Sequence, residues 1–121
     1  MAQNDDSVTC DTHEHTPHTH TPRPEATIVQ TAAMFNALGD SARLRLMETL
    51  FDGEHCVSEL AQEMGESLST ISQRLKVLYQ AGLVSKRRQG RHIYYALADE
   101  HIIELLRNGF AHASGEGHHH P

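Results

Sequence analysis

The period of the apolar residues between positions 57 and 97 restricts the fold of this chain more than any other feature. Four apolar residues recur at the i, i+3, i+4, i+7 spacing of an amphipathic helix: Val57, Leu60, Ala61 and Met64. Gly65 follows that run, and Ser67 stands where it can cap a second helix that continues through Leu78. The sequence therefore predicts two helices separated by a tight glycine-containing turn.

Beyond the second helix the apolar period changes to that of a strand. Ile93, Tyr95 and Leu97 alternate with other residues, and Gln89-Gly90 lies between two short runs, as a hairpin turn does. We therefore expect a two-stranded ribbon. Helix, tight turn, helix and hairpin form, in this order, a winged helix-turn-helix. The predicted fold class is mainly α with a small β-hairpin.

Helices are also expected on both sides of this unit. From about Ala26 apolar residues again recur at helical spacing, and Gly39-Asp40-Ser41 supplies a helix stop followed by an N-cap. A last helix is expected from about Glu100 to His112. The predicted folded domain spans residues 25–113.

The two ends of the chain have a different composition. Residues 1–24 are rich in Thr, His, Pro and Asp and have almost no large apolar side chains, so burial cannot repay the entropy of ordering them. Residues 114–121 read SGEGHHHP. We expect two flexible tails, the first containing His and Cys and the second containing Gly and His.

Charge is distributed unevenly along the chain. The net charge is −6, but residues 67–98 contain six Lys or Arg and no Asp or Glu. That segment carries +6, so the remainder carries −12. A solvated basic face on an ordinary helix pair would be the simpler interpretation. Because the basic segment coincides with a helix-turn-helix, we favour contact with double-stranded DNA.

The second helix of the pair has the side chains that such contact needs. At about 100° per residue, one side of it is apolar and carries Leu68, Ile71, Leu75 and Leu78. The remaining surface and its flank supply the candidate DNA contacts Ser69, Thr70, Ser72, Gln73, Arg74 and Lys76. Gln pairs with adenine, and Ser and Thr reach any base edge. The hairpin adds four cations suited to phosphates: Lys86, Arg87, Arg88 and Arg91.

Several other classes of protein fit the sequence poorly. No window approaches the roughly 18 apolar residues that span a bilayer, and the first ten residues lack the features of a signal peptide. We therefore expect a cytoplasmic protein without a membrane partner. In that reducing compartment Cys10 and Cys56 are expected to be free thiols or metal ligands. No Gly-rich phosphate loop or nucleophile–base arrangement predicts an enzyme.

Three runs of the sequence resemble the ArsR/SmtB family of metal-responsive bacterial repressors, over residues 28–112. They read LGDSARLRLMETL, HCVSELAQEMGESLSTISQRLKVLYQAGLVSKRRQGRHIYYAL and DEHIIELLRNGFAH. The resemblance implies a homodimer that binds an operator inverted repeat without metal and releases it when metal binds. It further implies that a metal efflux or sequestration gene is thereby derepressed. The family often has His where Arg74 stands, a difference expected to affect operator preference.

Two histidines of the last helix cannot share a metal ion within one chain. His101 and His112 are eleven residues apart, so they lie about 20° apart on the helix but roughly 16 Å apart along its axis. Two copies of the helix packed antiparallel would bring His101 beside His112 of the partner subunit. An apolar arc beside the histidines would form the seam: Ile102, Ile103, Leu105, Leu106 and Phe110. The alternative is two surface histidines on a dimer helix.

The resemblance also implies the other ligands of this site. The Asp-x-His pattern makes Asp99 a ligand, although it also suits an N-cap and can serve as both. The family carries an acid or His where this chain has Gly115, so Glu116 or His118 is the candidate fourth ligand. A tetrahedral set of His and carboxylate favours Zn²⁺, whereas extra imidazoles in octahedral geometry suit Ni²⁺ or Co²⁺.

A second metal site of the family joins a Cys of the tail to a Cys at the first helix of the pair. Cys10 and Cys56 match these positions, with His13, His15 and Glu59 as further candidate ligands. Mixed sulfur, nitrogen and oxygen donors favour Zn²⁺, and Cd²⁺ prefers more thiolates. The alternative is a small buried Cys56 and a tail that binds metals weakly.

Two alternative functions remain open at this point. A His-rich metal-buffering protein would account for the tails but not for the basic segment without acids. A repressor of the same fold could instead respond to nickel or cobalt, or to oxidation of Cys10 and Cys56.

Overall fold

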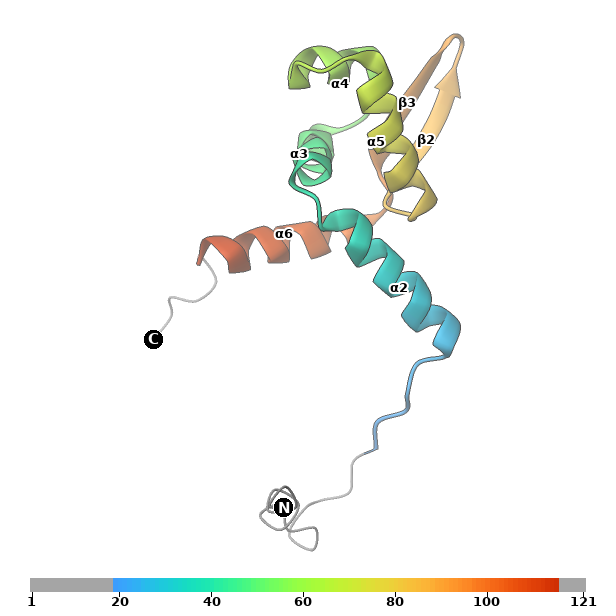
Figure 1. Ribbon diagram of the computed structural model, residues 1–121, viewed down its shortest axis with the longest axis vertical. Helices are drawn as coiled ribbons and strands as arrows, with labels where there is room; N and C mark the ends of the chain where they lie inside the picture. The colour runs from blue at the N-terminus through green and yellow to red at the C-terminus, as the bar shows by residue number, and fades with distance from the viewer. Residues whose placement is uncertain (1–18, 116–121) are drawn as a thin grey trace, which may run out of the picture.

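The computed structural model describes residues 19–115, which form a mainly α-helical domain with one small sheet (Figure 1). The elements, in chain order, are α2 (Glu25–Leu38), α3 (Ser41–Thr49), the short 3₁₀ helix η3 (Leu50–Asp52), β1 (His55–Cys56), α4 (Val57–Met64), α5 (Leu68–Gln80), β2 (Val84–Gln89), β3 (His92–Leu97) and α6 (Glu100–Ser114). The β2–β3 hairpin extends from one end of the domain, and α2 and α6 lie at the other end (Figure 1). This order confirms the predicted winged helix-turn-helix.

Side-chain and glycine caps fix the ends of the helices. The Asp40 carboxylate accepts a hydrogen bond from the Arg43 N–H at 3.0 Å at the start of α3, and Ser67 Oγ accepts from the Thr70 N–H at 3.1 Å at the start of α5. Gly65 ends α4 with a left-handed φ of 69°, a conformation that glycine adopts without steric cost. Gly65 and the Ser67 cap delimit the turn between α4 and α5 at the positions that the sequence indicates, and the Asp40 cap begins α3.

The core lies where α3, α4 and α5 meet the base of the hairpin. Its largest fully buried side chains are Leu46, Met47, Leu60, Ile71, Leu75, Leu78 and Leu83. Three of them come from α5, at the i, i+4 and i+7 positions of one apolar face. The same face orients α5, so its opposite side is left at the surface of the domain.

The sheet has three strands rather than the predicted two. β1 pairs with β3, and β3 pairs with β2, both antiparallel. Cys56 lies opposite Tyr94, and Tyr94 lies opposite Arg87, so these residues form one row across the sheet. The sequence did not predict β1, because a strand of two residues is too short to show an alternating pattern. The segment is extended because it pairs with β3.

The hairpin turn lies one residue later than expected. Gln89 pairs with His92, which leaves Gly90 and Arg91 as the two loop residues. Gly90 has φ of 64°, and two-residue hairpin loops require such a positive φ. The glycine, rather than Gln89, therefore begins the turn.

The structure corrects the predicted burial of several apolar residues. Leu68 was expected on the buried side of α5, but it lies in the first turn, at the edge of a surface hollow, and is 57% exposed. On α2, Ile28 and Phe35 have the expected spacing but are half exposed. Ile102 and Leu106 of the predicted α6 seam are buried within their own chain. Helical spacing gives a shared face, but not the element that covers it.

We expect Leu75→Ala to lower the free energy of unfolding by about 2–5 kcal/mol, because it leaves a cavity at a fully buried position. Leu68→Ala, on the same helix, is the matched control and should change it by less than about 0.5 kcal/mol. Urea unfolding followed by circular dichroism measures both variants. Equal destabilisation by the two would contradict this account of the core.

The remaining predictions about chain ends fall largely outside the described part of the chain. Helix α6 continues to Ser114, two residues beyond its expected end, and Gly115 caps it with φ of 83°. The predicted ligands Cys10, His13, His15, Glu116 and His118 lie outside residues 19–115. Within that range, no helix combines the length and the apolar character that crossing a membrane requires.

Candidate nucleic-acid interface and metal ligands

The exposed side of α5 has a shallow hollow of about 450 Å³ at the surface of the domain. Ser69, Thr70, Gln73 and Arg74 line this hollow, so four of the predicted base-contacting residues share one surface. The Arg74 side chain is partly covered, and its Nη2 lies 3.4 Å from Oε2 of Glu66, which precedes the helix. Hydroxyl, amide and guanidinium groups here can donate to and accept from base edges.

A second hollow of about 400 Å³ joins α5 to the hairpin. Ser72 of α5 and Arg91 of the hairpin turn both line it, together with His92 and Leu68. These residues lie far apart in the sequence, and the packing of β2 against α5 and of β3 against α4 brings them together. Ser72 and Arg91, two of the predicted DNA contacts, therefore border one hollow.

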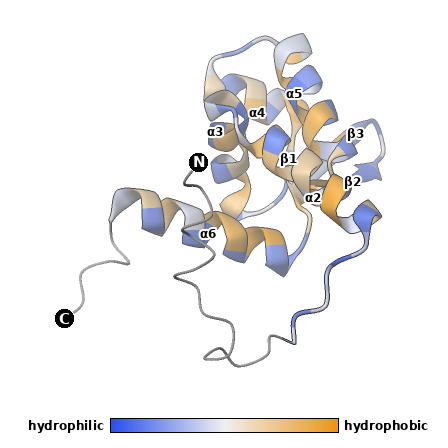
Figure 2. Ribbon diagram, turned by 60° about the horizontal axis from the view of Figure 1, so that its bottom comes forward, coloured by the Kyte–Doolittle hydropathy of each residue, from blue (hydrophilic) through white to orange (hydrophobic). Residues whose placement is uncertain are grey.

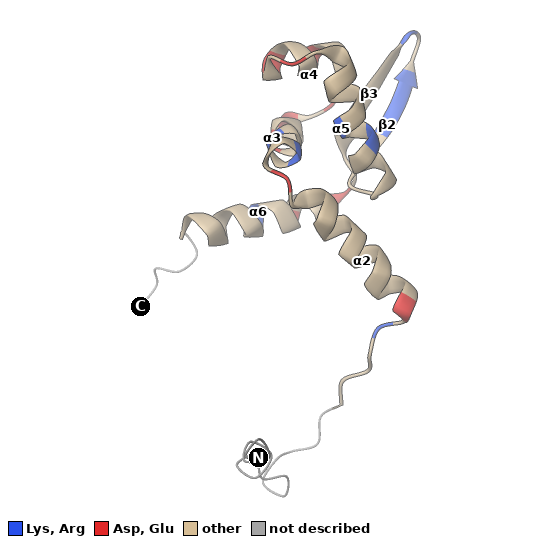
Figure 3. Cartoon of the chain, viewed as in Figure 1, with Lys and Arg blue, Asp and Glu red and all other residues tan. Residues whose placement is uncertain are grey.

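The basic side chains concentrate on β2 and α5 (Figure 3). Arg88 Nη1 donates to the Gly90 carbonyl at 3.3 Å, and Lys76 and Arg91 are exposed. Lys86 lies with its Nζ 4.2 Å from the centroid of the Tyr79 ring on α5, a cation–π contact. This contact joins β2 to the last turn of α5.

Arg87, like Arg74, binds a carboxylate of the same chain, but it does so through two N–H donors. Its guanidinium donates to Glu54 at 2.7 and 3.0 Å. The hydrogen bond from Arg87 lowers the pKa of Glu54. Sequence reasoning did not identify Glu54, because it lies 33 residues before Arg87 and no local pattern connects them.

At the start of α6, Asp99 acts as the N-cap and lies near His101. Its Oδ1 accepts a hydrogen bond from the Ile102 N–H at 3.0 Å and lies 3.7 Å from His101 Nδ1. The His101 side chain is 96% exposed. His112 lies in the last turn of the same helix and is also exposed. The structure brings Asp99 and His101 together, and the unbroken helix holds His112 away from both.

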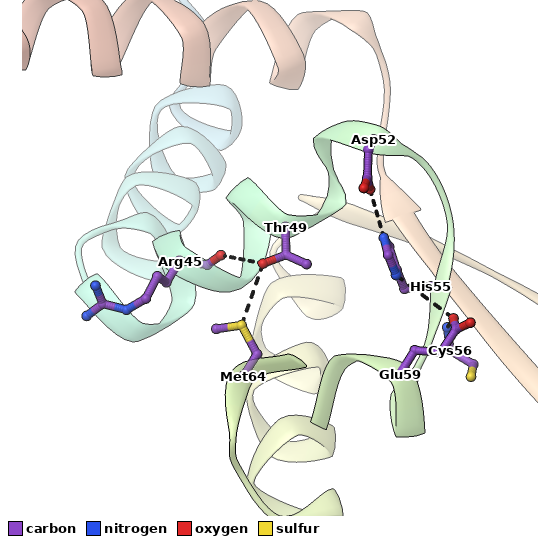
Figure 4. Close-up of polar contacts among 7 residues, drawn as sticks. All are labelled: Arg45, Thr49, Asp52, His55, Cys56, Glu59 and Met64. Atoms are coloured by element: carbon purple, nitrogen blue, oxygen red, sulfur yellow. Dashed lines mark hydrogen bonds and ion pairs between the residues drawn. The ribbon is translucent and has the colours of Figure 1, made fainter. Parts of the chain in front are cut away.

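The second predicted cluster lies where β1 meets α4 (Figure 4). Glu59 Oε1 accepts a hydrogen bond from the Cys56 N–H at 2.9 Å, and this bond lowers the pKa of the Glu59 carboxyl. The Cys56 thiol is buried, with Sγ 3.2 Å from Ser58 Oγ. Sulfur and carboxylate donors therefore share this end of α4, and the carboxylate also caps the helix.

His55 belongs to the same cluster, although sequence reasoning did not select it. Its Nε2 lies 2.8 Å from Asp52 Oδ1, and its Nδ1 lies 3.9 Å from Glu59 Oε1 (Figure 4). In the part of the chain that the structure describes, no three His, Cys, Asp or Glu side chains are arranged to hold a metal ion. Either predicted site thus requires further ligands from elsewhere.

An apolar groove lies at the end of the domain opposite the hairpin. Its volume is about 260 Å³, and α2, α3 and α6 line it with Phe35, Leu38, Leu44, Leu105, Leu106, Gly109, Phe110 and Ala113. Beside it, Ile28, Val29 and Phe35 are at least half exposed on α2. Figure 2 shows hydrophobic and hydrophilic segments alternating along α6. Burial of a surface of this kind against a partner would be favourable.

Comparison with known proteins finds that this chain is similar to bacterial transcriptional regulators. Residues 40–86 match the family model described as bacterial regulatory protein, arsR family. The chain is 47% identical over 78 residues to the transcriptional repressor SmtB homolog of Synechocystis sp., covering 64% of this chain and 59% of that relative. It is 35% identical over 82 residues to the cadmium resistance transcriptional regulatory protein CadC homolog of Staphylococcus aureus, covering 67% and 68% respectively.

A solved structure extends the similarity to most of the domain. The solution structure of a homodimeric winged helix-turn-helix DNA-binding domain from Mycobacterium bovis superposes with a TM-score of 0.75 at 33% identity. The superposition covers 87% of this chain and 99% of that one.

Proposed function

Because this chain belongs to the arsR family of bacterial regulatory proteins, we propose that it is a metal-sensing transcriptional repressor that binds operator DNA as a homodimer. One observation supports DNA binding most directly. Ser72 of α5 and Arg91 of the hairpin turn line a common hollow, and Figure 3 shows Lys and Arg residues on α5 and β2. The relatives named above are regulators rather than enzymes.

In this proposal α5 enters the major groove and the hairpin contacts the adjacent backbone. Gln73, Ser69 and Thr70 reach base edges, and Arg88, Arg91 and Lys76 neutralise phosphates. Half-sites of an inverted repeat lie one helical turn or a multiple of it apart, so recognition depends on the distance between two copies of α5. The dimer interface therefore controls affinity for the operator.

The apolar groove and the exposed side of α2 are the proposed dimer interface. The interface buries Phe35, Phe110 and Leu105, which the single chain leaves partly uncovered. An antiparallel pair of α6 helices across a two-fold axis brings the start of each beside the end of the other. His101 of one subunit then approaches His112 of the partner subunit, twice per dimer.

The donors at that junction fit a divalent metal ion. Imidazole and carboxylate groups are ordinary Zn²⁺ ligands, and Asp99 and His101 already lie together on an accessible surface. The proposed set is Asp99, His101, His112 of the partner subunit and Glu116 or His118. Zn²⁺ is the proposed metal, with Ni²⁺ or Co²⁺ as alternatives if more imidazoles join. Bound metal would tie the two α6 helices together.

Release of DNA then follows from linkage between the two sites. A ligand shifts an equilibrium only if it prefers one state, and a change from 1:99 to 99:1 requires about 5.5 kcal/mol of preference. The ligands on α6 hold the subunits at one relative angle. Because α6 packs on the core through Ile102 and Leu106, a change in that angle also moves the domain of each subunit. The two copies of α5 then change their relative position. Derepression of an efflux or sequestration gene would be the consequence.

A second metal site at α4 is part of the proposal. Cys56 and Glu59 would ligate there with Cys10 and His13 or His15. Zn²⁺ fits this mixed donor set, and Cd²⁺ would be bound with fewer thiolates than it prefers. Oxidation of the two cysteines is the alternative signal at the same place. A metal response that survives replacement of both cysteines by serine would rule out cysteine oxidation as the signal.

The function is tested by selecting a duplex from a random-sequence pool with the metal-free protein, then titrating zinc into that complex. Enrichment of an inverted repeat and its release by zinc would support the repressor. A protein that binds zinc but enriches no duplex would instead be a metal buffer. The enriched sequence is called the selected duplex below, and a scrambled version of it serves as the non-specific probe.

We expect Arg88→Gln and Arg91→Gln each to weaken binding to the selected and scrambled duplexes by similar factors. Each should reduce the slope of log affinity against log salt by about 1, since one phosphate contact is lost. Fluorescence anisotropy over a range of about 50 to 200 mM salt measures the slope. Arg107→Gln on α6 removes the same charge from an ion pair with Glu104 and should leave the slope unchanged. An equal effect of Arg107→Gln would contradict the placement of the DNA surface.

A further inference from the structure

The wing, defined here as the β2–β3 hairpin, is held to the domain by little apolar burial. Along β2 only Val84 is buried, and along β3 only Leu97, which pairs with it at the base. The inner half of the wing is anchored, because β3 pairs with β1 at Tyr94 and Tyr95, and Tyr95 packs against the core. Between Tyr94 and the hairpin turn the wing has no third strand and extends from the helices (Figure 1), so the orientation of this outer part depends on side-chain contacts.

An ion pair joins the wing to the segment that precedes β1. Arg87 Nη2 donates to Glu54 Oε1 at 2.7 Å, and Arg87 Nε donates to Glu54 Oε2 at 3.0 Å. Two N–H donors on the two oxygens of one carboxylate fix the plane and the direction of both side chains. Both side chains remain about half exposed, at 49% and 40%. Such a pair contributes little to overall stability, but it restricts orientation.

The guanidinium of Arg87 is also held from within the wing. Its Nη1 donates to Gln89 Oε1 at 2.7 Å, and its central carbon lies 5.1 Å from the centroid of the Tyr94 ring. Tyr94, on the central strand β3, pairs with Arg87 of β2 on one side and with Cys56 of β1 on the other. The guanidinium thus binds the wing on one side and Glu54 on the other. It therefore holds the wing in a fixed position relative to the segment that precedes β1.

We propose that Glu54 is a positioning residue for DNA recognition, which holds the wing at the angle to α5 that lets both contact the same half-site. The proposal rests on the DNA-binding function proposed above. Glu54 acts through Arg87 and contacts no DNA itself. Of the six cations in residues 67–98, Arg87 is therefore assigned to orientation of the wing rather than to a phosphate.

A purely electrostatic role for Glu54 predicts the opposite result. As an acid beside a basic wing, it would repel phosphates, and its removal would tighten binding to every duplex. Loss of a positioning contact instead frees the wing, so the selected duplex loses affinity whereas the scrambled duplex does not. The sign of the change produced by Glu54→Gln thus separates the two roles.

The experiment compares full-length wild type and Glu54→Gln by fluorescence anisotropy on the selected and scrambled duplexes. We expect about tenfold weaker binding to the selected duplex, comparable with the loss of one specific base contact, and less than about twofold weaker binding to the scrambled one. Glu104→Gln is the charge-matched control, because it breaks an exposed ion pair with Arg107 on α6. Unchanged or tighter binding of Glu54→Gln to the selected duplex would overturn the proposal.

A double-mutant cycle tests whether Glu54 acts through Arg87. In an Arg87→Gln background, Glu54→Gln should cause no further loss of affinity for the selected duplex. A further loss of about tenfold there would overturn the proposal, and circular dichroism melts verify that each variant is folded. A wild type that enriches no duplex would refute the proposed function. A wild type that binds, with Glu54→Gln equal to it, would refute the role of Glu54 alone.

Discussion

Zinc should no longer release DNA from the His101→Ala or His112→Ala dimer. In the wild type we expect zinc to lower affinity for the selected duplex by about 5- to 150-fold, the usual range of coupling between two sites. Each substitution removes one imidazole from both copies of the interprotomer site, so the remaining donors no longer tie the subunits together. Metal-free affinity should stay within about twofold of wild type, because both residues lie on α6, which carries none of the predicted DNA contacts.

Fluorescence anisotropy with and without zinc measures this response. Asn108→Ala is the matched control: it is exposed on the same side of α6, about 20° from His101 on the helical wheel, but its side chain is not a favoured zinc ligand. It should retain the full response. Release that survives in both histidine variants would place the sensor at Cys56 and the N-terminal residues instead.

A mixture of the two variants tests whether the site spans the subunits. A heterodimer of one His101→Ala subunit and one His112→Ala subunit contains one site with both histidines and one with neither. Each homodimer contains two incomplete sites. We therefore expect mixing to restore part of the zinc response, measured with purified heterodimer carrying a different affinity tag on each subunit. Failure of the heterodimer to respond would argue against antiparallel α6 helices, since a site within one subunit cannot be restored in this way.

Phe35→Glu is expected to give a folded monomer without specific DNA binding. Phe35 is 53% exposed and lines the apolar groove of α2, α3 and α6, so the single chain tolerates a carboxylate there but a dimer interface would bury it. Binding through two linked modules exceeds that of one by about 10²- to 10⁴-fold. Affinity for the selected duplex should therefore fall at least about 100-fold, whereas one half-site should be bound as before.

Sedimentation equilibrium gives the mass of the variant, and circular dichroism shows whether it is folded. Gln30→Glu is the control on the same helix, about 140° around the axis from Phe35, where it adds the same charge at an exposed polar position. It should remain dimeric. A Phe35→Glu chain that stays dimeric at micromolar concentration would move the interface away from this groove.

Local signals account for the parts of the fold that were predicted correctly. Caps at Asp40 and Ser67, and the glycine at position 65, act within a few residues of themselves, so their effect can be read from the sequence. The same holds for the separation of His101 and His112, which follows from helix geometry alone. The polar side of α5 was also predictable, because its apolar residues share one face.

Other features required the contacts of the folded chain. Strand β1 forms because β3 offers it a partner, and two residues carry no period of their own. Leu68 and Ile71 both fit the apolar face of α5, yet only Ile71 reaches the core, whereas Leu68, in the first turn of the helix, lines a surface hollow. A periodic pattern specifies direction around an axis but not how far along it the neighbouring elements extend.

The sequence by itself determined the helices, the hairpin, the basic segment and the two histidines at opposite ends of α6. The tertiary structure distinguished the cations from one another, because it binds Arg87 to Glu54 across 33 positions and places Arg91 beside Ser72. It also divided the apolar residues of α6 between its own core and an uncovered groove. The reason is physical. Caps and periods depend on neighbours in the chain, whereas ion pairs and burial depend on elements that meet only after folding.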